Sequence, residues 1–284
     1  MKAPKFLKYL FFFLAFLSSS LWFLYFSSPP KNFSVNFFDV GSGDAILLRT
    51  PDNFKILIDG GPSSRVLEYL GKNLGPFDRK IDLLVLSHPH QDHMFGSAEI
   101  LKKYDVGMVL GTGILYTSSA YLEVLGKIKN QNINFIVAEQ GKILKFGDLE
   151  LQIFYPFESL VGKKMDNVNN SSVIFRAKYK KVSFLFLGDA EQEAGERLLK
   201  TNFHLRSDVL KISHQGSRNA AQNVPGFLEK VSPILAVISV GENKFGHPHK
   251  ETLDNLSKNN IKVLRTDEKG TITIESDGEK FWVK

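Results

Sequence analysis

The sequence predicts an α/β fold in which helices and β-sheets pack in layers. Strand-like pairs occur near both ends of the chain, and strand and helix patterns alternate between them. This order is typical of a layered sandwich rather than of a purely doubly wound sheet. Of the 284 residues, 43% are hydrophobic and 23% are charged, so the chain can bury a sizeable core. We find no repeat of fixed period, which argues against a solenoid.

The first thirty residues differ in composition from the rest of the chain. Lys2, Lys5 and Lys8 precede an uncharged stretch of 18 residues that runs from Tyr9 to Phe26. As a helix this stretch would be about 27 Å long, near the thickness of a hydrocarbon core. We therefore expect residues 1–30 to form a cytoplasmic tip, a transmembrane helix and a linker. The chain would then be a single-pass protein of the cell membrane, with its N-terminus cytoplasmic and the domain that follows the helix extracytoplasmic. A cleaved signal peptide, which usually has a shorter apolar core, is the alternative.

The second domain is expected to cover residues 31–284, where strands and helices follow in turn. Strands are predicted where short runs of β-branched and aromatic residues are bounded by turn-forming residues. Their ranges are 32–40, 44–50, 54–61, 81–87, 106–111, 134–139, 142–148, 149–156, 171–179, 182–189, 207–213, 234–240 and 262–267, with a closing hairpin over 270–284. Helices are predicted where apolar residues recur every three or four positions. Their ranges are 63–75, 94–103, 118–130, 190–200 and 249–260.

The composition limits the chemistry that the chain can perform. It contains no cysteine, so any transition-metal site must use His, Asp or Glu. The net charge is +6, with a pI near 9.2. This mild basic bias permits binding to a polyanion but does not require it.

The stretch "HPHQDH" at residues 88–93 carries the strongest functional signal. It supplies three histidines and one aspartate directly after the apolar strand 81–87. His88 and His90, two apart in an extended loop, can converge on one cation, while Asp92 and His93 can turn to a second. Neutral imidazole suits Zn, Mn or Fe, and a carboxylate offsets the charge of a dication. A polar loop with ordinary surface histidines is the alternative.

Other polar residues follow the ends of further predicted strands. Asp59, Asp189, His214 and His247 each do so. Taken alone, Asp189 is more often the N-cap of a helix, and His214 could equally be a structural histidine. Because ligand and catalytic groups collect at strand ends in layered α/β folds, their joint occurrence predicts one site.

Several stretches match one protein family. The "HPHQDH" motif resembles the signature of metallo-β-lactamase-fold hydrolases. From about residue 33 onward, the chain resembles the nuclease-like domain of ComEC competence proteins. The matching stretches are "FFDVGSGDA", "LIDGG", "SHPHQDHMFG", "NNSSVIF", "FLFLGDAE", "DVLKISHQGS", "PILAVISVGENKFGHPH" and "VLRTDEKGTITI". The resemblance implies a four-layer αββα sandwich that holds two divalent metal ions, Zn or Mn, and hydrolyses DNA.

The resemblance also assigns roles to residues. His88 and His90 look like ligands of one metal, Asp92, His93 and His214 like ligands of the other, and Asp189 like the bridge between them. His247 would act near the metals, with Asp92 handling a proton and His247 helping the leaving oxygen depart. Asp59 would orient the histidine loop, and Asp39 and Asp44 would shape the same edge.

Two departures from the family pattern bear on function. No histidine lies between His93 and His204, so the usual third imidazole of the first metal site is missing. Asn169 and Ser172 fit the family pattern there and could touch metal-bound water or phosphate. Ser42 and Gln215 also replace residues that the family often has. The positive residues that flank the ligand loops, and could hold phosphates, are Lys211, Arg218, Lys244 and Lys250.

The sequence thus predicts a membrane-anchored DNA nuclease or phosphodiesterase that uses a dinuclear, metal-activated water. Its expected partners are DNA or another phosphodiester, the membrane and a separate DNA-uptake channel protein. One alternative is a hydrolase of a small substrate that is not a nucleic acid, because this fold hosts many reactions. Another is a metal-poor, DNA-binding competence accessory protein.

Overall fold

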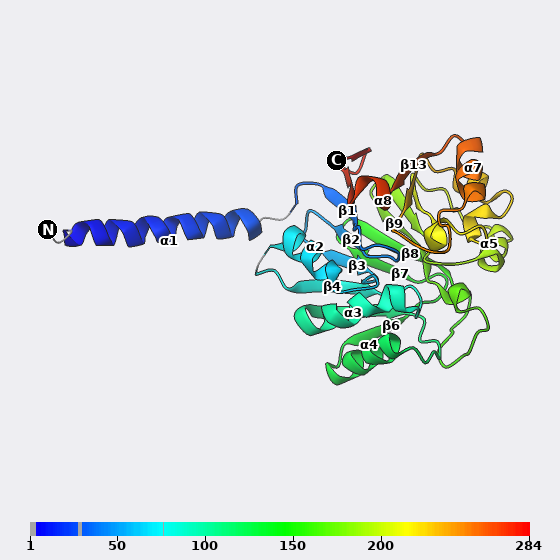
Figure 1. Cartoon of the computed structure of the whole chain (residues 1–284), viewed down its shortest axis with the longest axis horizontal. Coiled ribbons are helices and arrows are strands. Elements are labelled where there is room, and N and C mark those ends of the chain that lie inside the picture. Colours follow the sequence, from blue (N-terminus) through cyan, green and yellow to red (C-terminus); the bar gives the residue numbers. More distant parts are fainter. Residues whose placement is uncertain (1–3, 28–29, 76) are drawn as a thin grey trace.

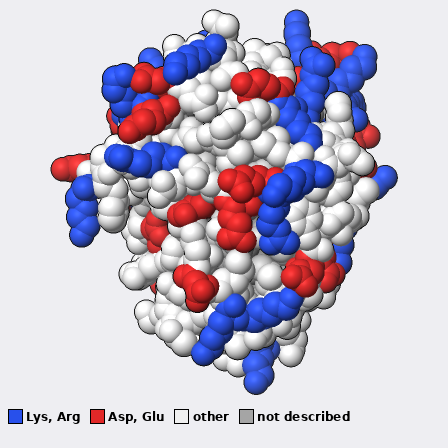
Figure 2. Space-filling model, turned by 90° about the vertical axis from the view of Figure 1, so that its right-hand side faces the viewer, with Lys and Arg blue, Asp and Glu red and all other residues white. Residues whose placement is uncertain are grey.

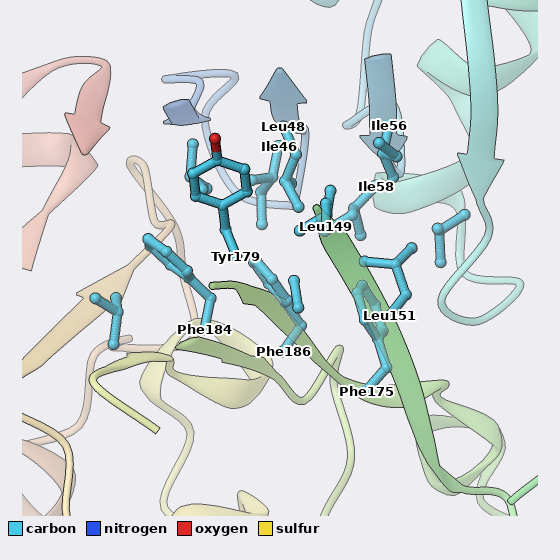
Figure 3. Packing of buried hydrophobic residues seen from close by; sticks show 14 of the residues in the cluster. Ile46, Leu48, Ile56, Ile58, Leu149, Leu151, Phe175, Tyr179, Phe184 and Phe186 are labelled. Atoms are coloured by element: carbon cyan, nitrogen blue, oxygen red, sulfur yellow. The ribbon is translucent and has the colours of Figure 1, made fainter. Parts of the chain in front are cut away.

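Two β-sheets pack face to face through large apolar side chains (Figure 1). This computed structural model describes residues 4–27, 30–75 and 77–284, without the side chains of residues 22–27. Ile46, Leu48 and Ile56 of one sheet lie opposite Leu149 and Phe175 of the other (Figure 3). Successive strand residues point to opposite faces, so every second residue of each strand enters this layer. Burial of these side chains is the main force that joins the sheets.

The first sheet has eight strands in the order β15-β14-β1-β2-β3-β4-β5-β6. Strands β3 to β6 run parallel, whereas β1, β2, β14 and β15 pair in antiparallel fashion. The strands are β1 (Phe33–Phe37), β2 (Ile46–Arg49), β3 (Lys55–Ile58), β4 (Lys80–Val85), β5 (Asp105–Gly111), β6 (Asn134–Val137), β14 (Ile272–Ser276) and β15 (Phe281–Val283).

The second sheet has seven strands in the order β13-β12-β11-β10-β9-β8-β7. Strands β10 to β13 run parallel, and β7 to β9 are antiparallel. The strands are β7 (Ile143–Phe146), β8 (Leu149–Tyr155), β9 (Ile174–Tyr179), β10 (Val182–Phe186), β11 (Val209–Lys211), β12 (Leu235–Ile238) and β13 (Lys262–Arg265).

Helices cover the outer face of each sheet, which completes four layers. Apolar residues of α2 (Arg65–Leu74), α3 (Gln91–Lys103) and α4 (Ser119–Asn130) pack on the first sheet. Those of α5 (Gln192–Leu199), α6 (Phe227–Val231) and α7 (Lys250–Lys258) pack on the second. The predicted αββα sandwich is therefore confirmed. The short helix α6 was not predicted, nor were the short elements α8 (Thr266–Lys269), η1 (Val168–Ser171), η2 (Ser213–Gly216) and η3 (Ala221–Asn223).

The prediction of a membrane anchor is wrong. The helix α1 (Lys5–Ser27) forms and extends away from the sandwich (Figure 1). Lys5 and Lys8 lie in its first turn, and three serines at 18–20 interrupt its apolar side chains. Among the described residues, no helix is long and apolar enough to cross a bilayer, so the single-pass location in the cell membrane is not supported. Lys2, which was predicted to lie in the cytoplasmic tip, is outside the described residues.

The parallel strands bring distant residues to one edge of the sandwich. The carboxyl ends of β3 and β4 meet at the same edge of the first sheet, and those of β10, β11 and β12 meet in the second. Asp59, His88, Asp189 and His214 all follow these ends. The parallel pairing therefore gathers the candidate residues without any long loop.

Close backbone contacts fix the start of α3 at this edge. The helix begins at Gln91, three residues earlier than predicted, so Asp92 and His93 lie in its first turn. The amide of Gly60 donates to the carbonyl of His93 over 2.9 Å. A Cβ atom on Gly60 would lie 2.1 Å from the amide nitrogen of Ser97. Only a residue without a side chain permits this contact.

Substitution Gly60→Ala should lower the free energy of unfolding by about 1–3 kcal/mol, because the added methyl group forces α3 away from β3. The matched control is Gly71→Ala in α2, where an added Cβ would meet nothing within 4 Å. Alanine is there expected to stabilise the helix by up to about 1 kcal/mol. Urea unfolding measures both values. Equal midpoints for the two variants would contradict the packing argument.

Candidate metal centre

Asp59 is the buried carboxylate from which the site is organised. It follows β3 with φ of 56°, in the left-handed region that few non-glycine residues adopt. Its carboxylate accepts hydrogen bonds from the amide of Ser87 at 2.8 Å and from the Ser87 hydroxyl at 2.5 Å. It also accepts one from Nδ1 of His93 at 2.8 Å. Burial raises the pKa of Asp59, while His93 and Ser87 oppose that rise.

These hydrogen bonds orient two histidines. Because Nδ1 of His93 donates to Asp59, its Nε2 is directed into the site, 3.3 Å from Oδ2 of Asp189. The Ser87 hydroxyl gives its proton to Asp59, so it accepts one from Nδ1 of His88 over 3.1 Å. The Nε2 atom of His88 then carries a lone pair. Burial, followed by the charge of His93, holds the pKa of His88 well below its ordinary value. His88 is therefore a neutral imidazole, the form that binds a cation.

Asp189 is the point on which the histidines converge. Its Oδ2 atom lies 3.3 Å from Nε2 of His93, 3.9 Å from Nε2 of His88 and 4.0 Å from Nε2 of His214. Its amide donates to the hydroxyl of Ser172 at 3.0 Å, which fixes the turn after β10. Burial alone would raise the pKa of Asp189, but His93 and the other histidines hold it well below its usual range.

The pKa of His93 moves in the opposite direction. Burial lowers it, but the charges of Asp189 and Asp92, with the hydrogen bond that Nδ1 of His93 donates to Asp59, raise it well above its ordinary value. In this structure a proton on His93 thus compensates the buried carboxylates. A bound cation would take over that role and displace the proton.

His214 is held by a second carboxylate, Glu191. It lies in a turn in which His214 and Gln215 both have left-handed φ, of 48° and 53°. Nδ1 of His214 is 3.4 Å from Oε1 of Glu191, and that oxygen also accepts from the side-chain amide of Asn169 at 2.8 Å. The pair repeats the relation between Asp59 and His93, because each carboxylate faces Nδ1 and leaves Nε2 turned toward Asp189.

The donor set fits a metal ion. Among the described residues, Nε2 of His93 and Oδ1 of Asp189 are buried and have no hydrogen-bond partner. Ligand atoms of His88, His93 and Asp189 all lie within 4.8 Å of one another. Such buried polar atoms are costly unless a partner satisfies them, and a cation would do so. A second group, Asp44, Asp59 and His93, fits less well, because Asp44 binds Lys211 at 2.8 Å and Ser87 binds Asp59.

His90 and Asp92 lie at the outer side of the cluster. Nδ1 of His90 is 3.1 Å from Nε2 of His88, and burial lowers the pKa of His90. The Asp92 carboxylate accepts from the side-chain amide of Gln215 at 3.2 Å and lies 3.7 Å from Nε2 of His93. Both side chains open onto a pocket of about 620 Å³. Its lining consists of Ser42, His90, Gln91, Asp92, Tyr116, Ser118, Asp189, His214, Gln215, Phe245 and His247.

His247 faces this pocket, and its predicted role in helping the leaving oxygen depart stays a prediction. Its ring centroid lies 5.4 Å from that of His214, and its Nδ1 is buried without a partner among the described residues. Burial, followed by the charges of His214 and His249, lowers the pKa of His247 to about 4. At neutral pH it is therefore a neutral imidazole, which can accept a hydrogen bond or bind a metal but has little imidazolium to give.

None of the predicted phosphate-binding cations lines the pocket, and Lys211, Arg218 and Lys250 bind other groups. Lys211 is 1% exposed, and its ammonium binds Asp44 and the carbonyl of Ile212. Arg218 pairs with Glu251 and lines a separate hollow. Lys250 pairs with Asp254. Lys244 lies 5.8 Å above the ring of Phe245, at the pocket rim.

The remaining predicted residues support the site or lie outside it. Asn169 and Ser172 hold Glu191 and Asp189 in place, as given above. Asp39 pairs with Arg65 of α2, at 3.5 Å, rather than with the histidine loop. Two histidines that were given no role lie nearby or elsewhere: His249 accepts from the amide of Arg218, and His204 lines another hollow.

Three site residues were missed in the sequence. Glu191 stands two positions after Asp189 in "GDAE", a spacing that could have marked it. Tyr116 and Phe245 line the pocket from the loops after β5 and β12. An isolated aromatic residue in a loop gives no signal of this kind in a single sequence.

Several known proteins are similar to this chain in sequence or in fold. Residues 38–230 match the sequence model of the Metallo-beta-lactamase superfamily. ComE operon protein 3 of Bacillus subtilis (strain 168) is 29% identical over 258 residues, which are 84% of this chain and 32% of that protein. Exodeoxyribonuclease WalJ of Streptococcus pneumoniae (strain D39) is 27% identical over 115 residues, 40% of each chain. The metallo-beta-lactamase fold protein YhfI of Bacillus subtilis superposes with a TM-score of 0.56 at 12% identity, covering 87% of this chain and 100% of that one.

These matches confirm the predicted resemblance to metallo-β-lactamase-fold hydrolases and to ComEC-type competence proteins. The chain spans about a third of the length of ComE operon protein 3. The likeness to YhfI, at its low identity, concerns the fold alone.

Metal binding should depend on Asp189. Zn²⁺ or Mn²⁺ at a hundredfold excess over its dissociation constant should stabilise the protein by about 2.7 kcal/mol, because the ion binds only the folded state. Asp189→Asn should remove this stabilisation in a thermal or urea titration. Asp39→Asn, the same change on a carboxylate outside the cluster, should keep it. Equal metal-induced shifts in both variants would rule out the proposed centre.

Asp59→Asn should weaken metal binding by about 10- to 100-fold without removing any ligand, because one of the two oxygens becomes an NH₂ donor. Such a donor cannot replace Oδ2, which accepts from Nδ1 of His93 and from the Ser87 hydroxyl. Isothermal titration with Zn²⁺ or Mn²⁺ measures the affinity, and the circular dichroism spectrum checks that the variant is folded. Unchanged affinity would show that Asp59 serves only the core.

Proposed function

The chain belongs to the metallo-β-lactamase superfamily, and we propose that it is a metal-dependent hydrolase that cleaves the phosphodiester backbone of DNA. One observation carries the proposal. His88, His93 and His214 turn their Nε2 atoms toward a single buried carboxylate, Asp189, beside an open pocket. Buried ligand atoms that lie next to a cavity and lack partners are the arrangement expected of a metallohydrolase.

The residues that would hold the metal are His88, His93 and Asp189, with His90, Asp92 and His214 in reach of a second ion. Imidazole and carboxylate ligands suit Zn or Mn. A divalent cation there supplies Lewis acidity toward a phosphoryl oxygen and lowers the pKa of water. In the reaction, water adds to phosphorus and gives up a proton. The bond from phosphorus to the leaving oxygen breaks with its electron pair, and a proton from solvent neutralises that oxygen.

The chain's own residues fix the geometry for this chemistry. Asp59 and Glu191 hold His93 and His214 by their Nδ1 atoms, so neither ring needs to reorient when substrate enters. Asp92, held by Gln215 at the pocket wall, is the carboxylate that can accept the proton of the attacking water. His247 offers a neutral imidazole that can accept a hydrogen bond from the substrate.

The names of the relatives support DNA as the substrate of this chain. ComE operon protein 3 belongs to the competence proteins, and WalJ is named an exodeoxyribonuclease. A small phosphodiester is the second candidate, because a pocket of about 620 Å³ is within the range of sites that enclose a small ligand. The buried atoms of His93 and Asp189 that lack partners argue against a metal-poor binding protein.

The test is a metal-supplemented nuclease assay on the full chain, with a labelled DNA strand and a chromogenic diester as substrates. The native chain should release labelled fragments, and His88→Ala should lower the rate to background because one metal ligand is gone. The control is His204→Ala, a histidine that lines a separate hollow. Cleavage of the diester alone would favour the small substrate. Full activity of His88→Ala on DNA would refute the assignment.

A further inference from the structure

Two aromatic side chains from different halves of the sandwich line the pocket. Tyr116 comes from the loop after β5 of the first sheet, and Phe245 from the loop after β12 of the second. The centroid of Tyr116 lies 5.8 Å from that of His90, and the centroid of Phe245 lies 5.8 Å from that of His247. Each ring therefore borders a histidine of the candidate centre. Aromatic rings at this place are not needed to hold a metal.

Phe245 differs from the core aromatics because 64% of its surface is exposed. Its loop is nevertheless built firmly. Oδ1 of Asn243 accepts from the amides of Phe245 and His247 at 3.1 and 3.0 Å, and Nδ2 of Asn243 donates to the carbonyls of Gly241 and His247 at 2.9 Å each. One asparagine thus closes the turn that displays both Phe245 and His247. A fixed backbone thus holds the ring in solvent. Its exposed apolar surface is unfavourable in water, so a ligand that covers the ring would gain binding free energy.

The charge around the pocket does not by itself explain binding of a polyanion. Among the described residues that line it, Asp92 and Asp189 are acidic and none is Lys or Arg. Figure 2, which views the side of the molecule that carries α5, shows basic and acidic residues interspersed, with no continuous field of either sign. Lys244, at the rim, lies over the Phe245 ring. Contacts other than phosphate pairing must therefore contribute to recognition of a nucleic acid.

We propose that Phe245 is a platform on which an unpaired nucleobase stacks beside the scissile phosphodiester, so that the substrate is a single strand or an unpaired end. This inference rests on the proposed function. Every base has a π-face, so stacking gives affinity without sequence preference, and a nearby Lys suits the adjoining phosphate. In a duplex, neighbouring bases cover those faces, so the ring meets a free base only where pairing is lost.

The test compares two oligonucleotides of equal length and charge at one fixed salt concentration. One is a single strand of thymidylates, and the other is the same backbone with abasic sites in place of the bases. Dissociation constants are measured by fluorescence anisotropy without added metal, so that no cleavage occurs. The native chain should bind the strand with bases more tightly, and Phe245→Ala should lose about 5- to 150-fold in affinity for that strand only.

Phe245→Trp should keep the preference, because it retains a stacking face. The matched control is Phe77→Ala, which removes an exposed ring near the amino end of β4, at the edge opposite the site. If native chain and Phe245→Ala bind both oligonucleotides equally, the platform is refuted. Cleavage of the two oligonucleotides with added metal is then measured separately. If the chain prefers the strand with bases but cleaves neither oligonucleotide, the hydrolase proposal is refuted and the platform stands. If it cleaves DNA but binds both oligonucleotides equally, the platform is refuted and the hydrolase proposal stands.

Discussion

The buried carboxylate of Asp59 is the constraint on which the site depends. It binds His93 directly and reaches His88 through the Ser87 hydroxyl, so one group sets the direction of two imidazoles. An isolated carboxylate in the core would be unstable, and these hydrogen bonds are what make its burial possible. The hydrogen bonds that offset the cost of burying Asp59 are therefore the same ones that orient the ligands.

The site exists only because the two sheets are aligned. His88 and His93 come from the first sheet and its helix layer, whereas Asp189 and His214 come from the second. Near the same edge, the buried ion pair of Asp44 and Lys211 also joins the two halves. Removing one partner of such a pair leaves an uncompensated charge, so it resists sliding of one sheet over the other.

Much of this arrangement could be predicted from the sequence, because it follows from local patterns. The order of strands and helices and the polar residues at strand ends led to His88, His93, Asp189 and His214. Lys211 was misassigned because its partner, Asp44, stands 167 positions away, and no local pattern reveals that pairing. Glu191 and Phe245 depend on how loops turn. The N-terminal anchor was predicted from the length of its segment, but the described apolar part begins only after Lys8 and is interrupted by the serines at 18–20.

The division of the ligands between two sheets has a mechanical consequence. A cation shared by His88 and Asp189 would be a non-covalent cross-link between residues about a hundred positions apart, and its binding energy would add to the contacts that join the sheets. Loss of the ion would then loosen the register between the sheets as well as the chemistry. Chelation would thus make this edge the first part of the sandwich to open to solvent or to a protease.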